Sequence, residues 1–196
     1  MEVILLNLTK MLTERKFLNI DNFDTNYEKL LKQVNEERIF KIKSDTDDRY
    51  FHIMFVYGKT TTIKKIQGLE TFLQNSKGHN RIFIADNINQ KAYKQFLELN
   101  NTEIFFEYEL KINIIDHDLQ PKFKVLTPEE KEIFMKEYDV TKKQMSKMKS
   151  IDPIARYYGL KGGSVVHITR ASTTAGLGFH YRIVIDSHPS ELFEKR

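Results

Sequence analysis

The sequence predicts two domains, an α/β domain over residues 1–120 and a small α+β domain over residues 121–196. Strand-like and helical segments alternate in the first part, which is typical of a sheet covered by helices. All four prolines lie after residue 120. The first part carries 17 Lys and Arg against 18 Asp and Glu, whereas the second carries 14 against 9. We therefore expect the join near "HDLQPKF", residues 117–123.

The elements of the first domain follow from the spacing of its apolar residues. Helical spacing predicts amphipathic helices near residues 5–18, 24–34, 63–73 and 93–97. Segments rich in β-branched and aromatic residues predict strands at "RIFKIK" (38–43), "RYFHIMFVYG" (49–58, ended by Gly58) and "RIFIADN" (81–87), and "EIFFEYEL" (103–110) follows the last helix.

The elements of the second domain are shorter. "TPEE" at residues 127–130 is a capping box with proline at the first helical position. Thr141 begins a lysine-rich helical stretch, "TKKQMSKMK", and a short helix begins at Pro153 with Gly159 as its left-handed C-cap. Two strands follow, "SVVHITR" (164–170) and "FHYRIVI" (179–185), joined by "ASTTAGLG".

Composition excludes several kinds of chemistry. The chain has 196 residues, 40% hydrophobic and 30% charged, which is typical of a globular protein. It has no cysteine, so disulfides, thiolate zinc sites and cysteine nucleophiles are excluded. The six histidines show no paired ligand spacing, so we expect no metal and no cofactor. The apolar run from Val3 to Leu6 is too short for a membrane span, so we expect no membrane partner.

Two patterns imitate enzymatic motifs. Gly162-Gly163-Ser164 completes neither a phosphate-binding loop nor a hydrolase elbow, so its glycines are interpreted as turn residues. Asp86 at the end of a strand, followed by Glu109-Leu110-Lys111, mimics a metal-dependent nuclease. Alternating charges on a strand produce such a triplet by chance, and nuclease activity of the first domain remains an alternative.

Two groups of lysines are candidate contacts for an acidic partner. Lys59, Lys64 and Lys65 lie beside three threonines, and both residue types donate hydrogen bonds to phosphates. The stretch that contains Lys142, Lys143, Lys147 and Lys149 is either a solvated helix face or a contact with nucleic acid or an acidic surface.

The most specific signal lies at residues 152–184, "DPIARYYGLKGGSVVHITRASTTAGLGFHYRIV". It resembles the C-terminal signature of the fifth subunit shared by the eukaryotic nuclear RNA polymerases, which has a shorter archaeal homologue. The matching residues are Asp152, Pro153, Ala155, Arg156, Tyr157, Tyr158, Gly159, Gly163, Val165, Val166, Ile168, Arg170, Ser172, Thr174, Ala175, Gly176, Tyr181, Arg182 and Val184. The proline and glutamate of that family pattern are replaced here by Ala171 and Thr173.

The first domain resembles, more distantly, the jaw domain of the eukaryotic and large-DNA-virus versions, which the archaeal homologue lacks. The similar segments are the N-terminal helix with "MLTERKF", the strand "FHIMFVYG" and the join "ELKINIIDH". This resemblance implies a jaw domain at residues 1–120 with a helix-covered, nuclease-like sheet, and an assembly domain at residues 121–196.

The resemblance implies a non-catalytic subunit of a DNA-directed RNA polymerase, with no catalytic residue, cofactor or metal of its own. The assembly domain is expected to dock on the largest subunit, and the jaw near downstream duplex DNA through Lys59, Lys64 and Lys65. Other polymerase subunits and transcription factors are further expected partners.

The implied location is the nucleus of a cell, or the virion or cytoplasmic factory of a large DNA virus. A stand-alone transcription adaptor is a second alternative. The expected docking residues are Asp152, Arg156, Tyr157, Tyr158, Lys161, Arg170, Ser172, Thr174, Tyr181 and Arg182.

Overall fold

The computed structural model describes residues 1–33, 39–172 and 176–193. The chain divides into two compact units, unit 1 at Met1–Asn113 and unit 2 at Ile114–Arg196. The segment 117–123, which the sequence suggests as the join, lies within unit 2 and ends in its first strand. In the described part of the chain, no helix has the length and apolar character needed to cross a membrane.

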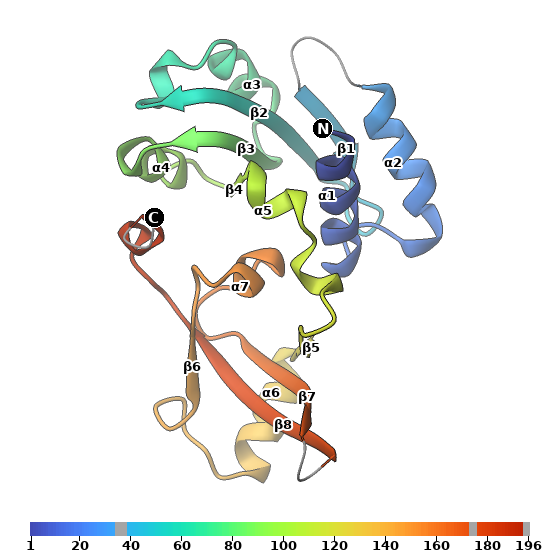
Figure 1. Ribbon diagram of the computed structural model, residues 1–196, viewed down its shortest axis with the longest axis vertical. Helices are drawn as coiled ribbons and strands as arrows, with labels where there is room; N and C mark the ends of the chain where they lie inside the picture. The colour runs from blue at the N-terminus through green and yellow to red at the C-terminus, as the bar shows by residue number, and fades with distance from the viewer. Residues whose placement is uncertain (34–38, 173–175, 194–196) are drawn as a thin grey trace. The chain divides into compact units, whose positions relative to one another are not determined.

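Unit 1 is built on a four-stranded sheet of order β1-β2-β3-β4 (Figure 1). β1 is antiparallel to β2, whereas β2, β3 and β4 run parallel and are connected through helices. The predicted alternation of strands and helices is thereby confirmed. The strands are β1 (Ile39–Lys43), β2 (Tyr50–Thr60), β3 (Asn80–Ile88) and β4 (Thr102–Phe106), and the helices are α1 (Glu2–Glu14), α2 (Phe23–Lys32), α3 (Leu69–Asn75), α4 (Gln90–Leu97) and α5 (Glu107–Lys111).

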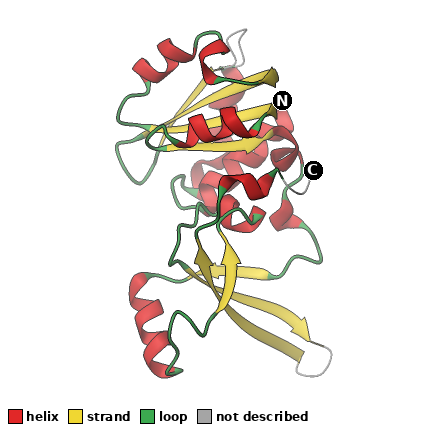
Figure 2. Cartoon of the chain, turned by 90° about the vertical axis from the view of Figure 1, so that its left-hand side faces the viewer, coloured by secondary structure: helices red, strands yellow, loops and turns green. Residues whose placement is uncertain are grey.

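Helices cover both faces of this sheet (Figure 2). Successive side chains of a strand point to opposite faces. On one face, the buried Phe83 ring lies 5.3 Å from the ring of Phe72 in α3 and 4.5 Å from that of Phe96 in α4. On the other face, the Arg15 guanidinium that follows α1 makes two hydrogen bonds of 2.8 Å to the Glu103 carboxylate of β4. Unit 1 therefore buries its apolar strands by itself.

Two glycines change the predicted boundaries in unit 1. Gly58 does not end β2, because the strand continues to Thr60 through an irregularity in its pairing with β3. Its φ of 73° explains the use of glycine there. The helix predicted at residues 63–73 is interrupted at Gly68, where φ is 77°. It forms a 3₁₀ turn at Ile63–Lys65 and then α3.

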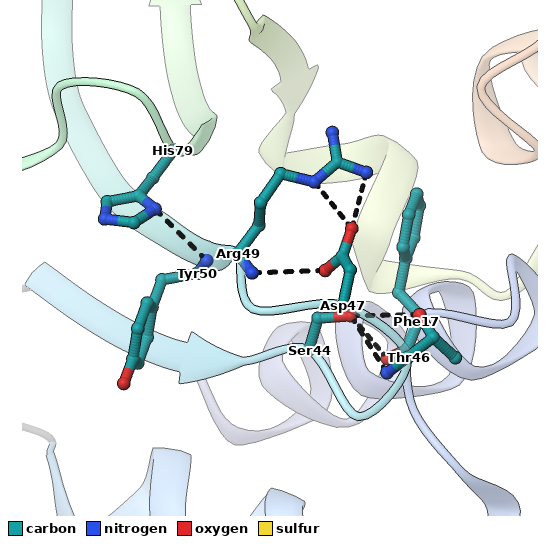
Figure 3. A network of polar contacts seen from close by, with 7 residues as sticks. All are labelled: Phe17, Ser44, Thr46, Asp47, Arg49, Tyr50 and His79. Carbon is teal, nitrogen blue, oxygen red and sulfur yellow. Dashed lines mark hydrogen bonds and ion pairs between the residues drawn. The ribbon is translucent and has the colours of Figure 1, made fainter.

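The turn between β1 and β2 is held by polar contacts (Figure 3). The Ser44 hydroxyl donates to the Phe17 carbonyl at 3.0 Å, and the backbone N–H of Arg49 donates to the Asp47 carboxylate at 3.3 Å. The backbone N–H of Tyr50 donates to Nδ1 of His79 at 3.4 Å. These contacts fix the start of β2 and the position of the His79 ring.

Unit 2 contains a second four-stranded sheet, of order β5-β7-β8-β6. β7 is antiparallel to both of its neighbours, and β6 runs parallel to β8. This mixture of a β-sheet and short helices agrees with the predicted α+β class. The strands are β5 (Lys122–Val125), β6 (Ser146–Lys149), β7 (Val165–Ser172) and β8 (Gly176–Ile185), and the helices are α6 (Pro128–Glu137) and α7 (Pro153–Tyr157).

The helix predicted from Thr141 is wrong, because residues 146–149 form strand β6. Met148 is buried, and Lys147 and Lys149 on either side of it are exposed. Pairing with Arg182–Ile185 of β8 gives this short segment a hydrogen-bonded ladder. Tertiary pairing therefore overrides the high helix propensity of lysine and methionine.

The core of unit 2 consists of two clusters. One cluster contains Met148, Ile154 and Ile168 and packs beneath α7. The other contains Phe134 of α6 together with Val165 and Ile183. Because Val165 and Ile183 are cross-strand partners and Ile168 has the opposite parity in β7, the two clusters lie on opposite faces of the sheet.

Candidate protein-docking surface

Helix α7 begins and ends as the sequence predicts. The Asp152 carboxylate accepts a hydrogen bond of 2.9 Å from the backbone N–H of Ile154, which makes Asp152 the N-cap. Gly159 has a φ of 62°, and the following Leu160 N–H donates to the Ala155 carbonyl at 2.8 Å. Gly159 therefore ends the helix in the predicted left-handed conformation, directly after Tyr158, which is the C-cap residue.

The Gly162-Gly163 turn lies against the side chain of the exposed Asp186, which a side chain at Gly162 would displace. A Cβ atom at Gly162 would lie 2.4 Å from a carboxylate oxygen of Asp186, and the Gly162 N–H donates to the same carboxylate at 3.2 Å. The Gly163 N–H donates to the Val184 carbonyl at 2.8 Å, and the Gly163 carbonyl accepts from Lys131 Nζ at 2.7 Å. These backbone groups form hydrogen bonds within the protein, as expected for turn glycines rather than for a phosphate-binding loop.

The predicted docking residues on the α7 side of the sheet differ in exposure. Tyr157 is buried and Tyr158 packs against the core cluster beneath α7. Arg170 and Arg182 are exposed, and their positions in the hairpin place them on the α7 face. Both tyrosines thus hold unit 2 together, while the arginines are available to a partner. Arg156 is half-buried within α7, and Lys161 is exposed before the glycine turn.

Tyr181 lies on the opposite face of the sheet from Tyr157 and Tyr158. Its ring stacks at 3.9 Å on Phe134 of α6 and at 4.7 Å on His167 of β7. His167 in turn stacks at 5.4 Å on Phe179. Burial raises the pKa of the Tyr181 hydroxyl, with the Tyr138 hydroxyl adding to the effect. The result is an aromatic row of Phe134, Tyr181, His167 and Phe179, whose outer end is 59% exposed at Phe179.

Only part of the aromatic row has a signal in the sequence. The signal is the alternation in "LGFHYRI", where Leu177, Phe179, Tyr181 and Ile183 recur every second residue and therefore share one face of β8. Phe134 and His167 reach the same row only through tertiary contacts that no local pattern reveals.

The far end of the β7–β8 hairpin holds the remaining predicted docking residues. β7 ends at Ser172, and Thr174 lies outside the described residues. Of the two departures from the family pattern, Ala171 is exposed and pairs with Leu177, whereas Thr173 lies outside the described residues.

The surface charge of this region has one sign. Residues 153–185 contain no Asp or Glu, but they contain Arg156, Lys161, Arg170 and Arg182. The side chains of Lys161, Arg170 and Arg182 are exposed. This region of unit 2 therefore favours an acidic partner.

The three lysines proposed from sequence in unit 1 are exposed at one end of β2. Lys59 lies in the last part of the strand, and Lys64 and Lys65 lie in the 3₁₀ turn that follows. A hydrogen bond of 3.2 Å from the Ile63 N–H to the side-chain oxygen of Gln95 fixes this turn against α4.

The nuclease-like triplet lies in a short helix, where its charged side chains make local contacts. Glu109 and Lys111 lie in α5, not on a strand. The Glu109 carboxylate accepts from the Phe106 N–H at 2.7 Å, and Lys111 forms an ion pair of 3.0 Å with Glu107. Among the described residues, no group of three His, Asp or Glu side chains is placed to hold a metal ion.

The fold consists of an α/β unit followed by a unit with a basic, partly uncovered sheet, and no described residues are grouped to hold a metal ion. Comparison with known proteins identifies its family. Residues 112–184 match the family model described as "RNA polymerase Rpb5, C-terminal domain". The chain is 31% identical over 192 residues to "DNA-directed RNA polymerase subunit 5" of Acanthamoeba polyphaga mimivirus, covering 94% of this chain and 91% of the relative.

Two further relatives show how the similarity is distributed. The chain is 29% identical over 184 residues to "DNA-directed RNA polymerases I, II, and III subunit rpabc1" of Dictyostelium discoideum, covering 90% of this chain and 92% of the relative. It is 45% identical over 76 residues to "DNA-directed RNA polymerase subunit Rpo5" of Archaeoglobus fulgidus, covering 39% of this chain and 100% of the relative. The chain belongs to the family of the fifth subunit of DNA-directed RNA polymerases.

Proposed function

We propose that this protein is a non-catalytic subunit of a multisubunit DNA-directed RNA polymerase, which it joins through unit 2. The observation that carries the proposal is the similarity to the mimivirus subunit over 94% of the chain. The local roles of Glu109 and Lys111 in α5 give the nuclease alternative no support.

The docking partner is the largest polymerase subunit, and the contact residues are the exposed cations of unit 2. Arg170, Arg182 and Lys161 bind acidic groups of the partner, and arginine is enriched at the centres of protein interfaces. Asp152, Tyr157 and Tyr158 act indirectly, because they cap and pack the α7 region that supports these cations. Arg156, Ser172, Thr174 and Tyr181 remain proposed members of the same interface.

Co-purification tests this function. A tagged full-length chain, expressed in the cells that make its polymerase, is expected to bring down the two large polymerase subunits at near-equal stoichiometry. Recovery without the large subunits would overturn the proposal, and substoichiometric recovery would favour a stand-alone adaptor.

Unit 1 is proposed to be the jaw domain, within residues 1–120, and to lie near downstream DNA. Lys59, Lys64 and Lys65 would contact phosphates without reading sequence, so the contact would weaken as salt rises. The net charge of −1 over residues 1–120 restricts this role to a local patch. Reversing the three lysines to glutamate is expected to lower polymerase affinity for downstream duplex and to flatten its salt dependence. Unchanged affinity and salt dependence would contradict the contact.

The location of the protein follows that of its polymerase. In a cell this is the nucleus, and in a large DNA virus it is the virion or the cytoplasmic factory. The relatives include both a viral and a cellular protein.

A further inference from the structure

The outer half of the β7–β8 hairpin extends beyond both edge strands of its sheet. β5 pairs with residues 166–169 of β7, and β6 pairs with residues 182–185 of β8. The two hairpin strands themselves pair continuously out to Ser172 and Gly176. In the part of the chain that the structure describes, no strand pairs with the outer edge of β8 between Gly176 and His180.

The hydrogen bonds at the inner end of β8 establish which residues direct their backbone groups to that edge. Val184 donates its N–H to Ser164 and accepts from Gly163 on the β7 side, whereas the Ile185 carbonyl accepts from Ser150 on the β6 side. Backbone direction alternates along a regular antiparallel pair, and this pairing shows no register shift. The N–H and C=O groups of Leu177 and Phe179 therefore point to the uncovered edge, while those of Gly178 point to β7.

The same two residues expose their side chains. Leu177 is 57% exposed and Phe179 is 59% exposed. Phe179 is the outer end of the aromatic row, and its inner neighbours His167 and Tyr181 are only partly buried. A sheet edge with free backbone groups and apolar side chains is a template for pairing with another chain.

The charge of the hairpin indicates what kind of chain pairs there. On the α7 face of the hairpin lie Arg170, His180 and Arg182, all exposed. On the α6 face lie the aromatic row and Leu177. A strand laid along this edge would direct alternate side chains to the two faces, so apolar residues would meet the row and acidic residues would meet the cations.

We propose that the edge of β8 at Leu177 and Phe179 binds an added β-strand, an extended segment of another polymerase subunit in which apolar and acidic residues alternate. This inference rests on the proposed function, and it names the manner of docking. In such strand addition, main-chain hydrogen bonds contribute affinity and the alternate side chains contribute specificity. A second copy of this chain fits less well, because the hairpin supplies no acidic residue to meet its own cations.

Amide hydrogen exchange tests the strand directly. The free full-length subunit and the assembled polymerase are exchanged in D₂O, quenched, and read residue by residue. We expect the amides of Leu177 and Phe179 to exchange at least about tenfold more slowly in the polymerase, because each gains a backbone hydrogen bond. The amides of Gly178 and His180 are internal controls, since β7 already accepts them in the free subunit.

A matched pair of variants separates the backbone from the side chain. Phe179→Ala and Phe179→Pro both remove the ring, but only proline removes the N–H at the outer edge. We expect Phe179→Pro to bind the polymerase about tenfold or more weakly than Phe179→Ala. Unchanged exchange at the buried amides of Val166 and Val184 verifies that the variant hairpin is folded.

The outcomes distinguish this inference from the proposed function. If the large subunits do not co-purify with the wild-type chain, the proposed function fails. If they co-purify while Leu177 and Phe179 exchange as fast as in the free subunit, only strand addition is overturned. Slow exchange of both amides in a free subunit that has the mass of a dimer would assign the edge to a second copy and also overturn it.

Discussion

The two sheets of this molecule bury their apolar residues differently. The sheet of unit 1 packs between helices, with Phe83 on one side and the Arg15–Glu103 pair on the other. In the sheet of unit 2, the β7–β8 hairpin extends beyond the neighbouring strands β5 and β6, and Phe179 is exposed. A sheet covered by its own helices buries its apolar side chains, whereas an open apolar edge is a template for pairing with another chain. The comparison therefore supports the proposal that the protein joins its polymerase through unit 2.

The largest expected effect is in the covered sheet. Phe83 is 0% exposed and packs between Phe72 and Phe96. Replacing it with alanine leaves a cavity and is expected to destabilise unit 1 by about 3–5 kcal/mol. Hydrogen exchange of the β2 and β3 amides measures this loss. If the β7 and β8 amides lost the same amount, the two units would not be independent and the comparison would fail.

A second effect in unit 1 depends on pH. His52 is 5% exposed, and its Nε2 has no hydrogen-bond partner among the described residues. Burial, followed by electrostatic repulsion from the nearby Lys41, His79 and Arg81 side chains, lowers the pKa of His52 from 6.5 to about 4. Below pH 6.5 the unfolded chain binds a proton at His52 that the folded chain does not bind until about pH 4.

The stability of unit 1 is therefore expected to fall as the pH falls from 6.5 toward 4, by as much as about 3 kcal/mol from this group. The control is His52→Phe, which keeps a ring against Phe72 and removes the titration. Amide exchange of β2 at pH 7 and pH 5 compares the two proteins. Equal pH dependence in the wild type and the variant would show that His52 is not the cause.

A smaller effect tests whether Asp152 of unit 2 only stabilises α7 or also contacts the partner. Asp152→Ala removes the N-cap of α7 and is expected to cost about 1 kcal/mol, whereas Asp152→Asn keeps a capping oxygen and is expected to be nearly neutral. Thermal unfolding of unit 2 measures both. If Asp152→Asn retains stability but weakens co-purification as much as Asp152→Ala, the charge of Asp152 contacts the partner and its role is not only structural.

The sequence predicted elements well wherever the local signal and the tertiary contacts agree. The strands β2 and β3 are long apolar runs, and α6 carries a complete capping box between Thr127 and Glu130. The prediction failed at residues 146–149, where lysine and methionine favour a helix but β8 offers a ladder.

The candidate docking surface could be predicted from the sequence only in part. The order of residues in the glycine-rich stretch 152–184 indicated the family. The cations Arg170 and Arg182 of this stretch are exposed. Composition alone could not place Tyr181 on the face opposite Tyr157. It also could not reveal the open edge at Phe179, because an edge depends on where β5 and β6 stop.

The most direct test of the account compares two variants of the tagged full-length chain by the ratio of large polymerase subunits recovered per bait. Phe83→Ala damages the covered sheet of unit 1, and Arg170→Glu with Arg182→Glu reverses charge on the uncovered sheet of unit 2. We expect near-equal stoichiometry with Phe83→Ala and a severalfold loss with the double reversal. Loss of the large subunits with Phe83→Ala and their full recovery with the double reversal would contradict the assignment of assembly to unit 2.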